Sequence, residues 1–530
     1  MTTTRFTGAK AYFVGGGIAS LAGAAYLIRD GDIAGENITI FEESSTLGGS
    51  LDGQGSPEQG YVMRGGRMFT DEAYTCTYDL MSFIPTLADP EQSVREEMRI
   101  FNEQVHSHSE ARLVVYGEKL DTSSMGFSAR DRLRLTELFL ISEEALGAKR
   151  IDDYFEPLFF TTNFWYMWCT TFAFQPWHSL VEFKRYCQRF LQEFHRINTL
   201  GGVKRTPLNQ YDSLVRPLKR WLNDRGVKFV MNSQVVDLDL VHGSDGKSVA
   251  GIKVLSEGVL QNVAVSPLDF VFVTNGSMTA ASSFGTMSSP APSLGPESAG
   301  GAWALWETLA AKDDNFGHPS VFSGHVAESN WISFTTTLSD PLFFQFMEQF
   351  TGNAAGTGGL VTFPRSNWLM SVVLAYQPHF LNQPKGVNVF WGYGLYPDQP
   401  GNYVQKKMSE CSGAEILTEL CGHLRFEDNL AHILETSNCI LCRMPYITSQ
   451  FMPRLAGDRP LVRPPGTTNL AFIGQYCELP DEVVFTVEYS VRSAQTAVFS
   501  LLASDRQVSP LYKGQHDPGV LLSAVETLFK

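Results

Sequence analysis

A glycine-rich segment near the start of the chain has the composition and position of a phosphate-binding turn. Gly15-Gly16-Gly17-Ile18-Ala19-Ser20 follows a predicted strand at 11–14 and opens a predicted helix at 18–28. Glycines let the backbone approach a pyrophosphate closely, and a helix N-terminus presents unpaired N–H groups to it. We therefore predict that Gly15 and Gly17 face a pyrophosphate. Ser20 stands where this fingerprint commonly has a third glycine, and it is small enough for the helix to pack on the sheet.

A carboxylate completes the pattern of a dinucleotide site. The second predicted strand, 38–41, runs directly into Glu42. Glu42 follows Ser20 by about 20 residues, which is the spacing at which an acidic side chain reaches a ribose hydroxyl. A glycine fingerprint alone is weak support, whereas the order strand, glycines, helix, strand and glutamate is typical of nucleotide-binding βαβ units. We predict that Glu42 accepts hydrogen bonds from a nucleotide ribose.

The composition limits the class of protein that can carry such a unit. The 530 residues include 41 basic and 56 acidic side chains, the formal charge is −15, and 43% of the residues are hydrophobic. A chain of this length and apolar content folds into several domains with buried cores. The acidic balance argues against a binder of nucleic acid or of anionic membranes, which would carry a basic face. We expect no nucleic-acid partner.

Three conspicuous segments could suggest a metal site, a membrane span and a secretory signal, and we assign none of these roles to them. Cys439 and Cys442 form the one CxxC in the sequence, and neither a second pair nor a histidine motif completes a zinc site. Eight cysteines in a chain of this length are typical of a reducing compartment. The range 157–181 is uncharged, but its Thr, Asn, Gln, Pro and His residues favour an aromatic core or the wall of an apolar cavity over a membrane span. The apolar run at 11–28 lacks a cleavage site, so we expect a cytoplasmic protein.

Later segments resemble parts of FAD-binding proteins of the glutathione-reductase type. Gly48-Gly49 follows the second strand, where such proteins bring the backbone close to the phosphate–ribitol region of the flavin. A predicted strand at 469–474 ends in Gly474, and a helix is predicted from about Thr486 to Leu502, as in the late FAD segment of these proteins. Between them, 227–240 and 248–255 are predicted to form a β-hairpin, and 270–274 a core strand that leads to Asn275. Asn275, Gly474 and Thr486 therefore join the predicted cofactor site.

The predicted fold is α/β, a Rossmann-like FAD-binding domain of glutathione-reductase type that two inserted substrate-domain segments split. The FAD-binding domain comprises 1–70, 205–276 and 441–505, and the insertions comprise 71–204 and 277–440. Apolar periodicity predicts helices at 180–194 and 209–224. The glycine-rich stretch 356–359 lacks the Gly-Lys-Ser/Thr of a phosphate loop, so a tight turn is predicted there. The C-terminal segment, 506–530, contains an amphipathic helix at 520–529 that is expected to pack on the protein, although a transient contact with a membrane surface remains an alternative.

Motifs spread over nearly the whole chain resemble those of the oleate hydratase family, formerly called myosin-cross-reactive antigens. They occur in the family's order, and so many long matches in sequence leave little room for chance. The matching segments are YFVGGGIASL at 12–21, RGGR at 64–67, NFWYMWCTTFAFQPWHS at 163–179, NQYDS at 209–213, VTNGSM at 273–278, GGLVTF at 358–363, SNWLMS at 366–371, QPHF at 377–380 and VFTVEYSVR at 484–492.

The resemblance implies an FAD-dependent hydro-lyase that adds water across the cis-9 double bond of a free fatty acid, converting oleate to 10-hydroxystearate. In this family the flavin is needed without net redox turnover. The RGGR segment and the residues after it, Arg67, Met68 and Phe69, are expected to follow the flavin. The family's catalytic tyrosine matches Tyr186, a weak acid but a plausible proton donor to an alkene if the developing cationic charge is stabilised.

Two departures from the family pattern concern the reacting groups. The family's catalytic glutamate, immediately after RGGR, is Met68 here, and a thioether cannot act as a general base. Three interpretations of this methionine remain: another carboxylate replaces the glutamate, water attacks the substrate without a base, or this protein is a slow enzyme. The family's carboxylate-binding array matches Gln210, Val373, Ala375 and His379, and only Gln210 and His379 are kept. Altered binding of the substrate head group is therefore expected.

The short start of the sequence, relative to family members whose N-terminal extension makes dimer contacts, predicts a monomer or a weak homo-oligomer. Two other functions compete with hydration. One is an FAD-dependent oxidoreductase of the amine oxidase or desaturase type, which shares the split fold. The other is a fatty-acid carrier with a vestigial flavin site, which the loss of the glutamate at 68 makes less remote.

Overall fold

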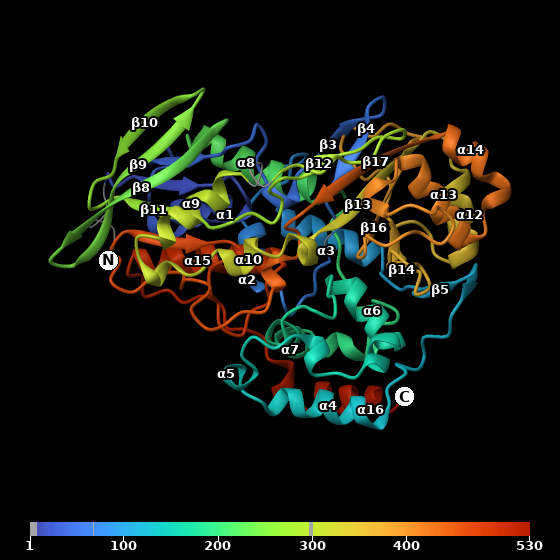
Figure 1. The fold of residues 1–530 in the computed structure, drawn as a ribbon. Helices are drawn as coiled ribbons and strands as arrows, with labels where there is room; N and C mark the ends of the chain where they lie inside the picture. The colour runs from blue at the N-terminus through green and yellow to red at the C-terminus, as the bar shows by residue number, and fades with distance from the viewer. Residues whose placement is uncertain (1–7, 67, 296–299) are drawn as a thin grey trace.

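A five-stranded parallel sheet forms the centre of one half of the molecule, which is described here from a computed structural model of residues 8–66, 68–295 and 300–530 (Figure 1). Its strand order is β18-β11-β1-β2-β7. The strands are β1 (Ala11–Val14), β2 (Ile38–Phe41), β7 (Lys228–Val230), β11 (Phe270–Thr274) and β18 (Leu470–Ile473). The sheet thus takes its strands from three distant parts of the chain. The strands β1, β11 and β18 are apolar and almost entirely buried, as expected for a parallel sheet covered on both faces.

Helices cover this sheet closely. Helix α1 (Ile18–Gly31) packs on α15 (Val487–Leu501), and α2 (Thr75–Met81) and α8 (Arg216–Asn223) lie beside them. A Cβ on Gly23 of α1 would come within 2.6 Å of the Phe13 ring, so glycine there allows helix and strand to approach. Thr486 caps α15 by accepting a hydrogen bond from the Tyr489 N–H. The structure therefore contains the predicted late strand and helix.

The predicted hairpin at 227–255 is only partly correct. β7 belongs to the parallel sheet and pairs with β2, while the antiparallel unit consists of β8 (Ser233–Gly243), β9 (Gly246–Ser256) and β10 (Val259–Ala264). The apolar pattern predicted a single strand at 227–240 because β7 and β8 are separated by only two residues. A positive φ at Asn232 turns the chain between them.

A second, six-stranded sheet has its own hydrophobic core, on the right of Figure 1. Its order is β12-β17-β13-β16-β15-β14, with β12 (Ser283–Phe284), β13 (Trp331–Leu338), β14 (Val361–Thr362), β15 (Met370–Leu374), β16 (Asn388–Gly394) and β17 (Ser437–Met444). Helices α12 (Leu342–Thr351), α13 (Gly413–Leu424) and α14 (Leu430–Glu435) belong to the same half. The short strands β3 (Gly53–Ser56) and β4 (Gly60–Met63) join the halves, because the N–H groups of Tyr61 and Met63 donate to the hydroxyls of Thr337 and Thr335 on β13.

A helical layer at the bottom of Figure 1 contains α4 (Ala129–Leu140), α5 (Glu143–Leu146), α6 (Asn163–Phe172), α7 (Leu180–Arg189) and α16 (Pro518–Phe529). The uncharged range 157–181 lies here, and its aromatic rings pack on one another in a buried core, for example Phe164 on Trp168 with centroids 5.2 Å apart. Packing therefore explains most of this segment. The remaining short elements are α3 (Val94–Gln104), α9 (Gly301–Ala310), α10 (Ser320–Ser323), α11 (Val326–Ser329), β5 (Val114–Val115) and β6 (Glu118–Lys119).

Two predicted helices are interrupted. The helix at 180–194 ends at Arg189 and continues as a 3₁₀ segment at Leu191–Arg196. The helix at 209–224 begins as a π-helical turn, Tyr211–Val215, before α8. Pro217 has no N–H to donate to the carbonyl four residues earlier, which favours the wider turn there.

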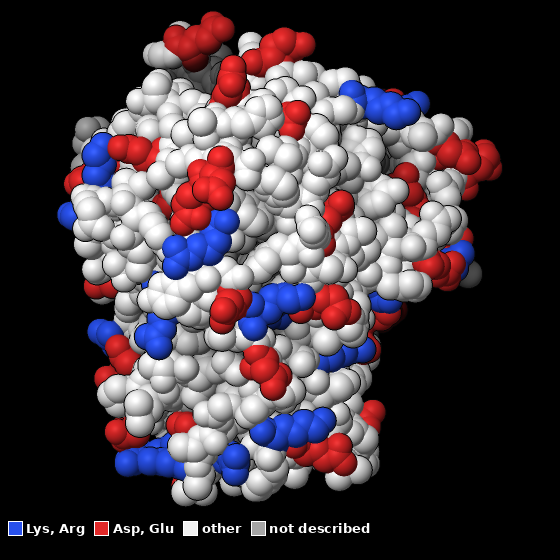
Figure 2. Space-filling model, turned by 90° about the vertical axis from the view of Figure 1, so that its right-hand side faces the viewer, with Lys and Arg blue, Asp and Glu red and all other residues white. Residues whose placement is uncertain are grey.

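The C-terminal helix α16 departs from its expected packing. Val520 and Leu528 contact the core, whereas Leu522 is 62% exposed and Phe529 is 68% exposed. The helix docks instead through small residues, with Ala524 and Thr527 buried. Among the residues that the structure describes, none of the helices has both the length and the apolar character needed to cross a membrane. Figure 2 shows acidic and basic side chains interspersed on one face, between large uncharged areas.

Candidate functional site

A long groove runs over the carboxyl end of the parallel sheet, where β1 and β2 end and α1 begins. It encloses about 1960 Å³, open solvent included, and its lining includes Gly15, Gly17 and Glu42. Gly15 adopts φ +92°, and its N–H donates to the Phe41 carbonyl at 2.9 Å. A Cβ built on Gly17 would meet no protein atom within 4 Å, so this residue faces open space at the N-terminus of α1. That combination leaves backbone N–H groups directed at a space that an anion can enter.

Glu42 is held at the edge of the groove by backbone donors. One of its carboxylate oxygens accepts from the Gly16 N–H at 2.6 Å, and the other accepts from the Ser44 N–H at 2.8 Å. A Cβ on Gly16 would lie 2.9 Å from that carboxylate and 2.4 Å from the Leu47 side chain. Glycine at 16 is therefore required for the close approach of Glu42. The carboxylate keeps acceptor capacity for hydroxyl donors in the groove, because each oxygen has two lone pairs.

Gly48, Gly49, Asn275 and Gly474 line the same groove, so the structure brings together residues from three predicted pieces of the nucleotide fold. The Gly48 N–H donates to the Gly16 carbonyl at 2.9 Å, which fixes the glycine pair beside the phosphate-binding turn. Asn275 is fully buried, and neither atom of its amide group has a hydrogen-bond partner in the described structure. Buried amides are normally satisfied, so this one points to a polar ligand or ordered water in the groove.

Four predicted cofactor residues lie outside the lining of the groove, and one of them, Met68, lines the second cavity described below. Ser20 is completely buried, with its hydroxyl 3.4 Å from that of Thr274. Phe69 packs edge-on against Tyr74 in the core, and the Thr486 hydroxyl is engaged in capping α15 and in a hydrogen bond to the Val483 carbonyl. Arg67, which was also predicted to contact the cofactor, lies outside the described residues.

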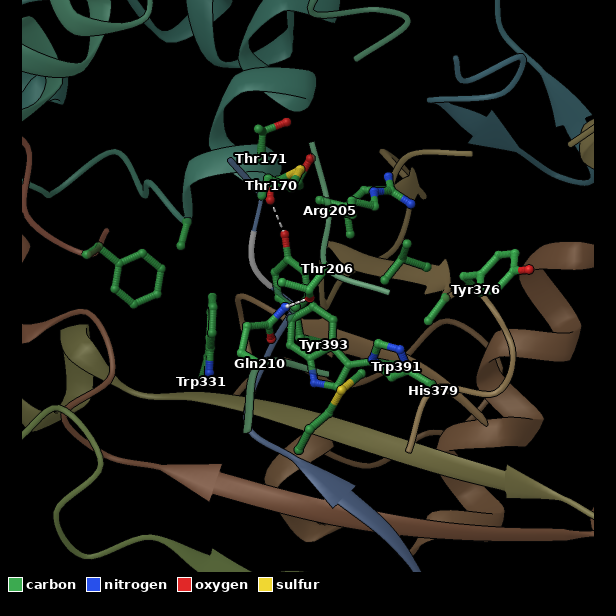
Figure 3. Close-up of a pocket in the computed structure, with 18 of the residues that line it drawn as sticks. Thr170, Thr171, Arg205, Thr206, Gln210, Trp331, Tyr376, His379, Trp391 and Tyr393 are labelled. Atoms are coloured by element: carbon green, nitrogen blue, oxygen red, sulfur yellow. Dashed lines mark hydrogen bonds between the residues drawn. The ribbon is translucent and has the colours of Figure 1, made fainter. Parts of the chain in front are cut away.

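A second cavity, of about 890 Å³ with open solvent included, lies next to Gly66 and Met68 and is largely apolar (Figure 3). Gly66 and Met68 line it, whereas Arg64 lines the groove over the parallel sheet, which we call the nucleotide groove after its predicted ligand. The chain near Gly66 therefore lies between the two spaces. Its wall is formed by side chains from both halves of the molecule: Met63, Phe101, Thr170, Thr171, Ala173, Arg205, Thr206, Gln210, Trp331, Leu360, Val373, Ala375, Tyr376, His379, Trp391, Tyr393 and Phe485. None of these described lining residues is an Asp or a Glu. We call this cavity the apolar pocket.

Three predicted residues, Met68, Gln210 and His379, meet in the apolar pocket although they come from distant segments. The Gln210 amide donates weakly to the Thr206 hydroxyl, at 3.4 Å (Figure 3). Burial lowers the pKa of His379 to about 4, so its ring is neutral near pH 7. Its Nδ1 atom has no partner among the described residues. The ring can therefore take part in a hydrogen bond with a ligand in the pocket.

Tyr186 is not among the residues that line the apolar pocket. It is 1% exposed, and its hydroxyl donates to the Val484 carbonyl at 2.5 Å. The next residue, Phe485, forms part of the pocket wall, and its ring packs at a tilt against Phe451, which also contacts the Tyr186 ring. The tyrosine thus lies one aromatic layer behind the wall.

Buried ion pairs fix the helix that carries Tyr186. Glu182 of α7 accepts from Arg459 at 2.9 Å, and Arg189 pairs with Glu482 at 3.0 Å. The Arg459 charge and neighbouring arginines hold the pKa of Glu182 at about 2, despite its complete burial. Removing one partner of such a buried pair strongly destabilises a protein, because the other charge is left buried without compensation. The intact pairs therefore hold α7 in one position.

Sequence reasoning missed most of the pocket wall. Arg205, Trp331, Trp391 and Tyr393 carry its polar atoms and aromatic surface, yet they occur singly in loops and strands. Neither indole N–H has an acceptor in the described structure. The one available signal was position, because Arg205 lies just before the NQYDS segment. The CxxC pair offers no additional site: burial raises the pKa of Cys442 to about 11 and that of Cys439 to about 12, and the described residues include no metal-binding cluster.

Comparison with known proteins shows the family to which this chain belongs. A model of the MCRA family matches residues 8–499. The chain belongs to the MCRA family. An oleate hydratase from Streptococcus pyogenes serotype M49 (strain NZ131) is 39% identical over 97% of this chain and 89% of its own length. A linoleate hydratase from Lactiplantibacillus plantarum is 34% identical over 98% of both chains.

Among solved structures, the MCRA-family chain resembles an oxidoreductase from Methanosarcina mazei, with a TM-score of 0.51, 12% identity, and coverage of 92% of this chain and 99% of that chain. At this identity the likeness concerns the fold alone. It supports the mixed α/β fold with a parallel sheet that the sequence predicted. The family membership confirms the resemblance drawn from the motifs.

Proposed function

We propose that this protein hydrates the cis-9 double bond of unsaturated free fatty acids, converting oleate to 10-hydroxystearate. The observation that carries this proposal is the similarity, over nearly the whole chain, to an oleate hydratase and a linoleate hydratase. The apolar pocket supports it, because an alkyl chain needs a long apolar wall with few polar groups. The direct test is incubation of the protein with FAD, a reductant and oleate, followed by mass spectrometry. Formation of 10-hydroxystearate is expected, and unchanged oleate would contradict the proposal.

We infer that FAD occupies the groove. Gly15, Gly17 and the N-terminus of α1 would hold the pyrophosphate, and Glu42 would accept the ribose hydroxyls. Gly48, Gly49, Asn275 and Gly474 would follow the phosphate–ribitol and flavin part, and the orphaned Asn275 amide fits such a polar ligand. Ser20, Arg67, Phe69 and Thr486 would then support the cofactor segments from outside the groove or beside it. By analogy with the family, the flavin supplies its chemistry without being consumed in a net redox step.

The proposed organisation is a FAD-binding domain of glutathione-reductase type at 1–70, 205–276 and 441–505. The insertions 71–204 and 277–440 would provide substrate-binding regions, and 506–530 a C-terminal helical segment. Two observations support this division. The parallel sheet takes strands from each of the three pieces, and most of the pocket wall comes from the insertions.

In the proposed reaction Tyr186 donates a proton to the alkene, water attacks the cationic carbon, and the proton that the attached water then loses restores the phenol. The buried ion pairs on α7 support a fixed position for the phenol. Since the hydroxyl lies behind Phe485, a small rotation of that side chain would be needed to bring substrate and phenol together. The described lining offers no carboxylate to replace the family's glutamate. Of the three alternatives, we therefore favour attack by oriented water without a carboxylate base, with Met68 as part of the apolar wall.

Gln210 and His379 are proposed to contact the substrate near its head group, as their family counterparts do. Both side chains line the apolar pocket, which supports this assignment. Val373 and Ala375 line the same pocket without polar side chains, which agrees with the expected change in head-group binding.

Two rival functions are distinguishable by experiment. An amine oxidase- or desaturase-type enzyme would bleach the flavin spectrum when mixed with substrate under anaerobic conditions. A fatty-acid carrier would bind oleate and leave it unchanged. The hydratase relatives favour hydration over both.

The cellular setting is also proposed. All eight cysteines are free and buried, which supports the reducing environment of the cytoplasm. A monomer or weak homo-oligomer is expected. The outward apolar side chains of α16 support a transient contact with a membrane surface, and co-sedimentation of the protein with neutral phospholipid vesicles, compared before and after Phe529→Ser, tests this.

A further inference from the structure

A basic side chain lies on the wall of the apolar pocket without an acidic partner. Arg205 lines the pocket, and its guanidinium donates to the carbonyls of Gly356 at 3.0 Å and Gly358 at 2.6 Å. Among the described residues, no carboxylate forms an ion pair with it, and burial lowers its pKa to about 10. Its backbone is fixed as well, because its N–H and carbonyl are bonded to the Asn102 side chain. The charge is therefore rigidly held at the pocket and is not neutralised by the protein around it.

A second unpaired arginine lies behind the first. Arg112 is 1% exposed, and it donates to the Thr171 hydroxyl at 2.9 Å, while its Nε and Nη1 atoms have no partner in the described structure. Burial and the nearby Arg205 charge lower the pKa of Arg112 to about 10, so both arginines remain cationic near pH 7. Two adjacent cations in a low-dielectric region without a counter-ion are costly. Such a locus favours the binding of an anion.

The glycine-rich stretch at 356–359 builds this locus. Its carbonyls receive the Arg205 guanidinium, and a Cβ on Gly359 would lie 3.3 Å from the Arg112 side chain. A Cβ on Gly356 would lie 2.7 Å from Tyr376, which is 41% exposed and lines the pocket. Figure 3 shows Arg205, Tyr376 and His379 on one side of the pocket and Trp331 and Gln210 toward the other. The cationic end of the pocket is thus the end next to an exposed side chain.

We propose that Arg205 binds the carboxylate of the fatty acid, with Arg112 as a positioning residue behind it. The assignment rests on the proposed function, which supplies an anionic amphiphile as the substrate class. A charged head bound near the exposed end leaves the alkyl chain to fill the apolar wall. This cation replaces the polar contacts that Val373 and Ala375 no longer offer, and the neutral His379 ring adds a hydrogen-bonding group beside it.

The test compares a charged ligand with a neutral ligand of the same chain. Binding of oleate and of oleyl alcohol to the FAD-loaded protein is measured by titration calorimetry for the wild type, Arg205→Gln and Arg205→Lys. Removal of a hydrogen-bonded charge should weaken oleate binding by roughly 10- to 100-fold and leave oleyl alcohol within about twofold. Arg205→Lys keeps the charge but not the fork of donors, so an intermediate loss is expected. Arg220→Gln, on the exposed face of α8, serves as a control that should leave both affinities unchanged.

Equal loss of both ligands in Arg205→Gln, or no loss of either, would overturn the assignment. If Arg205→Gln fails to fold, the ratio of oleate to oleyl alcohol affinity in Arg205→Lys decides, and an unchanged ratio contradicts the proposal. If the wild type binds oleate through Arg205 without hydrating it, the proposed function alone is refuted. If Arg205→Gln hydrates oleate with an unchanged KM, only the binding of the carboxylate by Arg205 is refuted.

Discussion

The nucleotide groove and the apolar pocket lie on either side of one short segment, yet they are built in different ways. The groove is formed largely by backbone at the ends of parallel strands, with glycines where atoms approach closely. The pocket is formed by side chains that come singly from many elements. A backbone site depends on the fold and on a few glycines, whereas a side-chain site can change its chemistry by single substitutions. We interpret Met68, Val373 and Ala375 as such changes in a chain of the MCRA family.

The pocket side of this comparison depends most on Tyr186. Tyr186→Phe keeps the ring in its aromatic layer and deletes the hydroxyl, so turnover should fall by roughly 10²–10⁴ while FAD binding is retained. Steady-state rates of 10-hydroxystearate formation, with the flavin content of each preparation measured from its spectrum, check this. A variant with near-normal turnover would make Tyr186 a packing residue only.

The groove depends on Glu42 as its one proposed carboxylate contact to the ribose. Glu42→Ala should weaken FAD binding by about 1–3 kcal/mol, the scale of a hydrogen bond to a charged group. Titration of the apoprotein with FAD, monitored by flavin fluorescence, measures the effect. Glu36→Ala removes an exposed carboxylate from the same βαβ unit outside the groove and is the matched control. If the two variants bind FAD equally well, Glu42 does not belong to the site.

Two neighbouring glycines separate the needs of the fold from the needs of the ligand. Gly17→Ala adds a methyl group to open space at an extended backbone position, so thermal stability should stay nearly unchanged while FAD affinity falls by roughly tenfold. In Gly16→Ala the same methyl group would clash with Leu47 and Glu42, so thermal stability should fall as well. Melting temperatures without FAD, together with FAD titrations, distinguish the variants. Equal effects on stability would contradict the geometry of the turn.

The smallest expected change in hydration rate is that of Met68→Glu, which tests whether the site lacks a carboxylate base. Met68→Glu would place a carboxylate on a wall without prepared partners, at a desolvation cost, so we expect little gain in hydration or a loss. A site that merely lacked its base should gain roughly 10²-fold or more. Rates of the wild type, Met68→Glu and the neutral Met68→Gln, at saturating FAD and equal reduction, decide between these. A large increase confined to the glutamate variant would refute attack without a carboxylate base.

The same difference explains what the sequence could predict. The strands at 11–14, 38–41 and 270–274, and the turn between the first strand and α1, were predicted because local patterns specify them. The assignment of β7 to the parallel sheet depends on pairing with β2, far away in the chain, and the hairpin pattern could not reveal it. The outward apolar face of α16 was likewise missed, since periodicity indicates an amphipathic helix but not what covers its apolar side.

For the candidate site, glycines and Glu42 follow a spacing rule, whereas Met68, Gln210 and His379 were found only through the family's motifs. Arg205 belongs to no motif, because its proposed role depends on the absence of a carboxylate beside it among the described residues. The neighbours of a side chain in the folded protein cannot be read from the sequence around it. Residues whose role depends on long-range neighbours are therefore the ones that sequence reasoning misses first.

The central claim is that this protein adds water to an alkene without net oxidation or reduction. The most direct measurement is an anaerobic reaction of the FAD-loaded, reduced protein with oleate in heavy-oxygen water, in which the product mass and the flavin spectrum are recorded together. We predict 10-hydroxystearate that carries one heavy oxygen from water, over many turnovers, with the flavin spectrum unchanged at the end. Product without the label, or a flavin that changes redox state in proportion to the oleate consumed, would contradict the account.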